Sequence, residues 1–140
     1  MDLTFPAEPA RLSDARAALR QWLTDSAVAE DQAYGILVAA DEACANAIEH
    51  GCRDRADGRV RLCATVVDGS LHLSVSDNGR WLPPAADPGD YRGRGLPLMR
   101  SLMDQVEVES GAAGTTVELR AELPGYERAH AGAVQDSAAR

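Results

Sequence analysis

The sequence of 140 residues contains no lysine, and all fourteen of its basic residues are arginines. A Walker-type phosphate-binding loop, the strand lysine of protein kinases and Schiff-base chemistry each require a lysine, so all three are excluded. If phosphates bind to this chain, backbone amides, a metal ion and arginine side chains must hold them. A bias toward arginine is also typical of a GC-rich genome, so the absence by itself predicts no function.

Long apolar runs and paired cysteines are lacking as well. No stretch approaches the roughly 18–20 apolar residues of a membrane span, and the start, Met1-Asp2-Leu3, lacks the basic region of a signal peptide. The three cysteines, Cys44, Cys52 and Cys63, form no CxxC pair, which favours reduced thiols over a disulfide framework or a zinc site. We therefore expect a cytoplasmic protein that does not bind a membrane.

The charge balance is acidic. The chain carries 22 aspartates and glutamates and a formal net charge of −8, which argues against nucleic-acid binding because that function needs a basic patch. The length predicts one folded domain over residues 1–123. The remaining residues, 124–140, combine Ala, Gly and charge without a period, and we expect a disordered tail there.

Apolar periodicity predicts helices and antiparallel hairpins. The period changes from 3.6 to 2 at Arg59, and Asp68-Gly69 predicts a tight turn between two strands. Gly35 allows a break or kink in the second helix. The expected helices lie at about 9–23, 28–49 and 96–103, and the expected strands at 2–5, 59–66, 71–76, 106–108 and 116–122. This order predicts an α+β fold: a two-layer sandwich with a mixed, mostly antiparallel sheet covered on one face by helices.

The densest set of polar side chains on a helix lies in residues 36–51, ILVAADEACANAIEHG. Glu42, Asn46 and Glu49 are spaced i, i+4 and i+7, so they share a flank beside an apolar stripe. This helix has no positive partner beyond His50, and a carboxylate and a carboxamide one turn apart could hold a divalent ion and accept a proton. On these residues alone, a solvated polar flank is an equally good interpretation. His50-Gly51 predicts the end of the helix.

Three later segments combine glycine with polar side chains. Asp77-Asn78-Gly79 ends a strand, where the aspartate could accept a hydrogen bond from an exocyclic amine while the glycine admits a flat ring. Gly93-Arg94-Gly95-Leu96 precedes a helix and could present N–H groups and an arginine to an anion. Gly114-Thr115-Thr116 could place a hydroxyl at a sheet edge. Each segment taken alone also fits an ordinary turn.

Taken in order, these segments resemble the four boxes of the GHKL ATPase superfamily, which includes DNA gyrase and histidine kinases. Glu42–Gly51 resembles the N box, and the three later segments resemble the D-x-G box, the second glycine box and the last box. Within the superfamily the sequence is similar to the anti-sigma-factor serine/threonine kinases, whose typical text E-A-x-x-N-A-I-x-H-G it matches closely. Trp81-Leu82-Pro83-Pro84 after the D-x-G box is also similar. The resemblance covers about Leu3 to Leu123 and implies the Bergerat fold.

The resemblance also implies ATP and Mg²⁺ as cofactors and a role for individual residues. Glu42 would be the general base and Asn46 the ligand of Mg²⁺. Glu49 and His50 are interpreted as supporting residues at the helix end. The implied nucleotide-binding residues are Asp77, Gly79 and Thr116 around the adenine, and Gly93, Arg94, Gly95 and Leu96 over the phosphates.

The activity implied is that of an ATP-binding anti-sigma factor and serine/threonine protein kinase. Its substrate would be an anti-sigma-factor antagonist, it would sequester a sigma factor, and it would form a homodimer. The alternative is a nucleotide-binding regulatory module with little or no phosphotransfer, possible also as part of a phosphatase fusion. Glu42 favours the kinase, because a module that only binds has no need of a base there.

Overall fold

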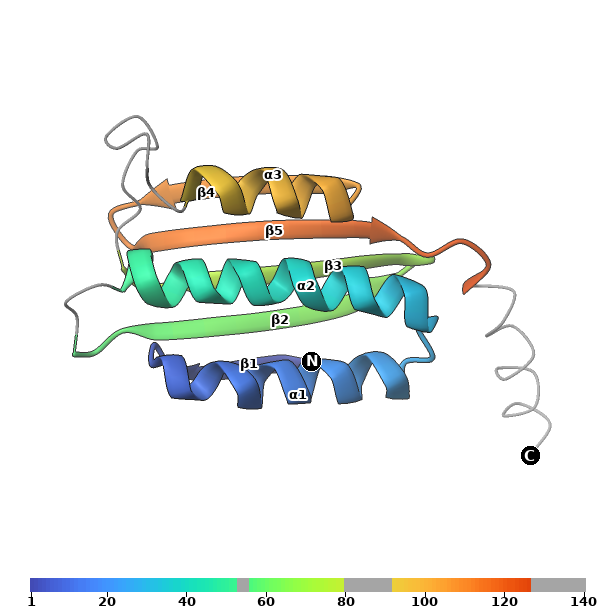
Figure 1. Ribbon diagram of the computed structural model, residues 1–140, viewed down its shortest axis with the longest axis horizontal. Coiled ribbons are helices and arrows are strands. Elements are labelled where there is room, and N and C mark those ends of the chain that lie inside the picture. Colours follow the sequence, from blue (N-terminus) through green and yellow to red (C-terminus); the bar gives the residue numbers. More distant parts are fainter. Residues whose placement is uncertain (53–55, 80–91, 127–140) are drawn as a thin grey trace.

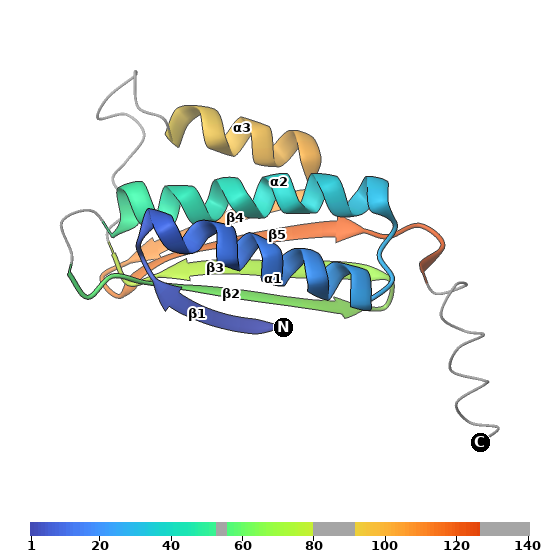
Figure 2. The same ribbon diagram turned by 60° about the horizontal axis from the view of Figure 1, so that its bottom comes forward.

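The computed structural model describes residues 1–52, 56–79 and 92–126. Five strands form one sheet in the order β1-β2-β3-β5-β4, and three helices cover one face of it (Figures 1 and 2). The strands are β1 (Asp2–Pro6), β2 (Arg59–Val67), β3 (Ser70–Asp77), β4 (Gln105–Gly111) and β5 (Gly114–Glu122). The helices are α1 (Leu12–Asp25), α2 (Glu30–Asn46) and α3 (Arg92–Leu102). The predicted α+β two-layer sandwich is confirmed.

All four strand pairings are antiparallel among the described residues, so the sheet lacks the parallel pair that the prediction of a mixed sheet allowed for. The reason lies in the crossover between β1 and β2. Helices α1 and α2 run in opposite directions and return the chain to the end of the sheet that it left (Figure 2). A single helix there would have made the two strands parallel.

The β2–β3 hairpin turns where the sequence predicts it. Asp68 and Gly69 have φ angles of 52° and 70°, the two positive values that a type I′ turn requires. The turn fixes the register, which sends Leu71, Leu73 and Val75 toward the helices and the residues between them to the open face. The position of every polar side chain at the end of β3 follows from this alternation.

Helix α2 lies over the middle of the sheet (Figure 1). Half of its buried residues are alanines, Ala39, Ala40 and Ala43, so its backbone can approach the strands closely. The helix continues through Gly35 without the break that the sequence allowed, and a Cβ there would make ordinary contact, 3.9 Å from Leu102 of α3. A π-helical turn over Ala47–Gly51 ends it where His50-Gly51 predicts.

Helix α3 begins at Arg92, four residues before the predicted start near Leu96. Two glycines and Pro97 in this stretch argue against a helix, because each glycine costs about 1 kcal/mol relative to alanine in a helix interior. Packing on α2 and the sheet, through the buried Met99 and Met103, outweighs that local preference.

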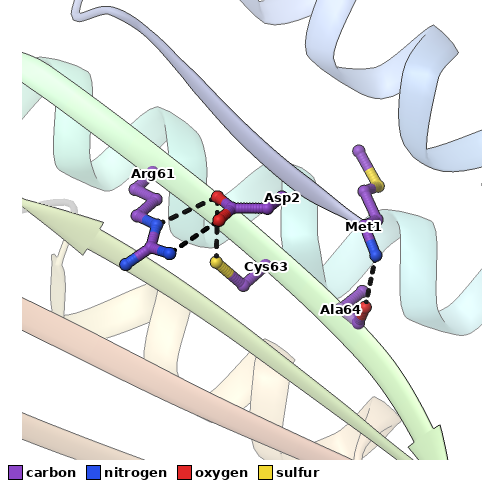
Figure 3. A network of polar contacts seen from close by, with 5 residues as sticks. All are labelled: Met1, Asp2, Arg61, Cys63 and Ala64. Carbon is purple, nitrogen blue, oxygen red and sulfur yellow. Dashed lines mark hydrogen bonds and ion pairs between the residues drawn. The ribbon is translucent and has the colours of Figure 1, made fainter.

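The first strand is held at the edge of the sheet by polar contacts (Figure 3). The Met1 amino group donates to the Ala64 carbonyl at 2.9 Å. The Asp2 carboxylate accepts two hydrogen bonds from Arg61, at 2.9 and 2.6 Å, and a weaker one from the Cys63 thiol at 3.4 Å. The Arg61 hydrogen bonds hold the pKa of Asp2 at about 2. These contacts join β1 to β2 on the open face.

The three cysteines are free thiols. Burial between α1 and α2 raises the pKa of Cys44 to about 12, so that thiol stays protonated at neutral pH. Burial also raises the pKa of Cys63. Neither thiol is activated as a nucleophile.

Folded contacts extend to Tyr126, three residues past the predicted domain end at Leu123. The Tyr126 hydroxyl donates to the Ser26 carbonyl at 3.0 Å, and its ring packs against the core. Residues 127–140 of the predicted tail lie outside the described residues, as does the predicted Trp81–Pro84 segment. Within the described ranges, no helix combines the length and apolar content needed to cross a membrane.

Candidate functional site

The four predicted segments meet at one end of the molecule. The C-terminal end of α2, the end of β3, the start of β5 and the start of α3 lie together in both views (Figures 1 and 2). The π-helical turn after α2 packs against both β3 and β5. Residues about 70 positions apart in the sequence are thus brought to one site.

Asn46, the last residue of α2, is buried, and its polar side chain has no partner among the described residues. It is 3% exposed, and neither its Nδ2 nor its Oδ1 forms a hydrogen bond within the described part of the chain. A buried polar group left unpaired costs about 1–3 kcal/mol, so natural proteins rarely keep one without a reason. An amide oxygen at such a position suits a hard divalent cation.

Glu42 lies one helical turn before Asn46 and is half-buried. The adjacent carboxylate, Asp41, faces α1 and forms a two-pronged ion pair with Arg16 at 2.8–3.0 Å. Glu42 forms no such ion pair with any described residue, which leaves its carboxylate available to a ligand. Glu49, predicted on the same flank, is exposed on the π-helical turn, so the three side chains do not share one environment.

Asp77 is the last residue of β3, and its Oδ1 accepts a hydrogen bond from the Gly79 N–H at 2.9 Å. This contact over two residues is an Asx turn, which fixes the carboxylate relative to the backbone that follows. By alternation Asp77 shares the helix-covered face with the buried Val75. Gly79 is itself buried beside it.

The neighbouring strand brings Thr115 to Asp77. The two residues are direct register partners, and Thr115 is 2% exposed with no hydrogen-bond partner for its hydroxyl in the described residues. The predicted Thr116 instead lies on the open face, where its hydroxyl is 3.1 Å from that of Ser76. The structure therefore places Thr115, and not Thr116, with Asp77.

Gly114 permits this pairing. Its φ is +134°, and a Cβ there would lie 1.9 Å from the Asp77 carbonyl oxygen. No side chain fits so close to a backbone atom. The first glycine of the Gly114-Thr115-Thr116 segment is thus required for β5 to begin directly against the end of β3.

The predicted phosphate segment forms the first turn of α3. Gly93, Arg94 and Gly95 are helical rather than in the loop that the sequence predicts, and Leu96 packs half-buried against the core. The first four N–H groups of a helix have no partner within it and carry the positive end of the helix dipole. The backbone at 92–95 can therefore receive an anion.

Comparison with known proteins shows which family this chain belongs to. Residues 5–121 match the model of the histidine kinase-like ATPase domain. The chain belongs to this family. It is 30% identical over 131 residues to an anti-sigma F factor of Geobacillus stearothermophilus, covering 86% of this chain and 90% of that protein. It is also 30% identical to the serine-protein kinase RsbW of Bacillus velezensis, covering 89% of this chain and 86% of that one.

The two relatives place the chain in the anti-sigma-factor and RsbW-like branch of the family. A solved structure is similar to this chain as well. The RsbU and RsbW domains of a Mycobacterium tuberculosis protein match with a TM-score of 0.72 at 29% identity over 88% of this chain. This chain spans 31% of the length of that one. The predicted resemblance to anti-sigma-factor kinases of the GHKL superfamily is confirmed.

For a histidine kinase-like ATPase domain, the donors present fit one Mg²⁺ ligand from the protein. No group of three or more His, Cys, Asp or Glu side chains is arranged to hold a metal within residues 1–52, 56–79 and 92–126. A cation here would therefore take its remaining oxygen ligands from phosphates and water, as Mg²⁺ commonly does. The Oδ1 of Asn46, which accepts no hydrogen bond from any described residue, is suited to be the protein's ligand to the ion.

Two residues that lie beside Asp77, namely Thr115 and Asn78, are not among the predicted site residues. Thr115 could have been found, because the alternation that places Val117 inward also places Thr115 inward. Asn78 left no comparable signal: its side chain is bonded to Asp57 and Arg59, which are 21 and 19 residues away. Such partners become evident only when the strands are paired.

Proposed function

We propose that this chain binds ATP with Mg²⁺, transfers the γ-phosphoryl group to a serine or threonine of an anti-sigma-factor antagonist, and binds a sigma factor. The observation that carries the proposal is the buried carboxamide of Asn46, which has no hydrogen-bond partner in the described part of the chain and lies at the end of the helix that also bears Glu42. The family membership and the relatives named anti-sigma F factor and serine-protein kinase support it.

In the proposed complex the adenine ring of the nucleotide binds at the strand ends. Asp77 accepts a hydrogen bond from the exocyclic amine of adenine, and Gly79 lies where the ring approaches the backbone. The hydroxyl of Thr115 is buried on the same face without a partner among the described residues, and it is the second polar group for the adenine ring. It replaces Thr116 in this role, because the Thr116 hydroxyl is paired with Ser76 on the other face.

The helix ends hold the phosphates and the metal. Asn46 contributes its Oδ1 to Mg²⁺, and the N–H groups at Gly93, Arg94 and Gly95 face the phosphates, with the Arg94 guanidinium as a further donor. Leu96 anchors this turn to the core. The bound ion neutralises charge on the phosphates, which is the principal chemical demand of phosphoryl transfer.

Glu42 accepts the proton of the attacking hydroxyl. Its carboxylate lies one turn from the metal ligand and has no competing ion pair among the described residues. A positioned base of this kind contributes about 10²–10⁴-fold to a proton-transfer step. Because it touches the reacting hydroxyl rather than the nucleotide, its removal affects turnover and leaves nucleotide affinity in place.

The test is transfer of label from γ-labelled ATP to an antagonist protein in the presence of Mg²⁺. We expect Glu42→Gln to lower the rate by about 10²–10⁴-fold with an unchanged Kd for ADP. Glu30→Gln, which removes an exposed carboxylate from the first turn of the same helix, is the matched control and should transfer label normally. Equal rates in the wild type and Glu42→Gln would contradict the assignment of the base.

A second candidate function is binding without transfer. It is favoured by the names of several relatives, which are called anti-sigma F factor without mention of a kinase. The same assay separates the two functions. A wild-type protein that binds ATP and a sigma factor yet labels no antagonist would support the binding module.

A further inference from the structure

Asn78, the middle residue of Asp77-Asn78-Gly79, uses both ends of its carboxamide. Its Oδ1 accepts a hydrogen bond from the Arg59 N–H at 2.8 Å, and its Nδ2 donates to the Asp57 carbonyl at 3.1 Å. Both partners are backbone groups in the segment that leads into β2. The side chain thus joins the end of β3 to the start of the neighbouring strand.

That segment is also packed on the end of α2. The Cys52 N–H donates to the Ala47 carbonyl at 2.9 Å and closes the π-helical turn. The Cys52 thiol lies 3.6 Å from the Asn78 Oδ1, and a Cβ on Gly58 would lie only 2.7 Å from the Cys52 Cβ. An unbroken series of contacts therefore runs from the turn that follows Asn46 to the side chain of Asn78.

The backbone of Asn78 is held from its other side by β5. A Cβ on Gly114 would lie 3.0 Å from the Asn78 Cα and closer still to Asp77. The Asx turn from Asp77 to Gly79 then spans the same residue. Asn78 is consequently the point at which the α2 end, the β2 start and the β3–β5 pair are joined.

We propose that Asn78 is a positioning residue that sets the Asp77 carboxylate at a fixed distance from the Asn46 carboxamide. The inference rests on the proposed function, in which those two groups bind opposite ends of one nucleotide. A nucleotide reaches both only if the strand end and the helix end keep their spacing. Asparagine is suited to the role because a single planar group supplies one acceptor and one donor, whereas aspartate lacks the donor.

The competing interpretation is that Asn78 only stabilises its turn. In that case a variant lowers the unfolding midpoint, but its folded fraction binds nucleotide as the wild type does. A positioning role instead changes how the two ends act together. The quantity that separates the two interpretations is the Mg²⁺ enhancement, defined as the Kd of a non-hydrolysable ATP analogue in EDTA divided by its Kd in Mg²⁺.

The experiment is isothermal titration of the full chain with that analogue, with Mg²⁺ or EDTA, well below the unfolding midpoint measured for each variant. Asn78→Ala removes both hydrogen bonds of the carboxamide. We expect it to weaken nucleotide binding by about tenfold and to bring the Mg²⁺ enhancement toward one. Asn78→Asp keeps the acceptor and should fall between Asn78→Ala and the wild type. It also carries the test if Asn78→Ala does not fold.

The matched control is Ser76→Ala, which removes a hydrogen bond to Thr116 on the open face of β3, next to Asp77 in the chain but on the other face of the strand. It should keep the wild-type affinity and enhancement. Folded Asn78 variants with wild-type values of both would overturn the positioning role. A wild-type protein that binds no adenine nucleotide would overturn the proposed function, and the inference with it.

Discussion

The two faces of the β3–β5 strand pair differ in whether their polar side chains have hydrogen-bond partners. On the open face the hydroxyls of Ser76 and Thr116 lie 3.1 Å apart and satisfy each other. One residue along each strand, on the face covered by helices, Asp77 pairs with Thr115, whose buried hydroxyl has no partner among the described residues. The same strands thus carry a satisfied pair on one side and an unsatisfied group on the other.

This difference distinguishes polar side chains that stabilise the fold from polar side chains that are available to a ligand. Polar groups that serve the fold find partners within the chain, because an unpaired buried group opposes folding by about 1–3 kcal/mol. Asn46 and Thr115, the described residues with buried unpartnered side-chain atoms, come from the end of α2 and the start of β5, two of the elements that meet at the candidate site. A ligand that pairs with both would remove the cost that the free protein carries.

The largest expected effect comes from Asn46→Leu. An apolar side chain of related shape has no unpaired polar atom, so we expect the free protein to gain about 1–3 kcal/mol in the free energy of unfolding while the Mg²⁺ enhancement of nucleotide binding is lost. Urea unfolding and isothermal titration measure the two quantities. The same substitution at Asn78, which breaks two hydrogen bonds, should instead destabilise the fold. Loss of stability in Asn46→Leu would contradict the idea that Asn46 is kept for a ligand.

A smaller effect is expected from valine at the two threonines. Thr115→Val removes a buried, unpaired hydroxyl at constant shape, so the unfolding free energy should rise by about 1 kcal/mol while the Kd for ADP rises about tenfold. Thr116→Val breaks the contact with Ser76 and should lower stability by about 0.5–1 kcal/mol without changing the Kd. Urea midpoints and titration with ADP give both values. If Thr116→Val alone weakened ADP binding, the two faces would have been assigned the wrong way round.

The sequence predicted the elements of this site better than the partners of its side chains. The turn at Asp68-Gly69, the inward Leu71 and Val75, and the end of α2 near Gly51 each follow from a local period or a single residue type. The choice between Thr115 and Thr116 depends on strand register, and an error of one residue there reverses the face. The start of α3 at Arg92 depends on packing that outweighs the preference of glycine. These are long-range effects, and a local pattern does not contain them.

The smallest effect is expected at the edge of the open face, where Asp2 pairs with Arg61 (Figure 3). The usual pKa of 3.8 falls to about 2 in the folded protein because Arg61 hydrogen-bonds the charged carboxylate. The ion pair therefore stabilises the fold above pH 4, and its contribution is lost as the pH falls from about 4 to about 2. Both side chains are more than half exposed, so the effect is small and is screened by salt.

Urea midpoints of the wild type and Asp2→Asn should differ slightly at pH 6 and converge near pH 2, and the difference should shrink in 1 M NaCl. A double-mutant cycle with Arg61→Gln isolates the pair. A difference that persisted unchanged at pH 2 would contradict this account, because loss of the Asp2 charge removes the ion pair that Asp2→Asn also lacks.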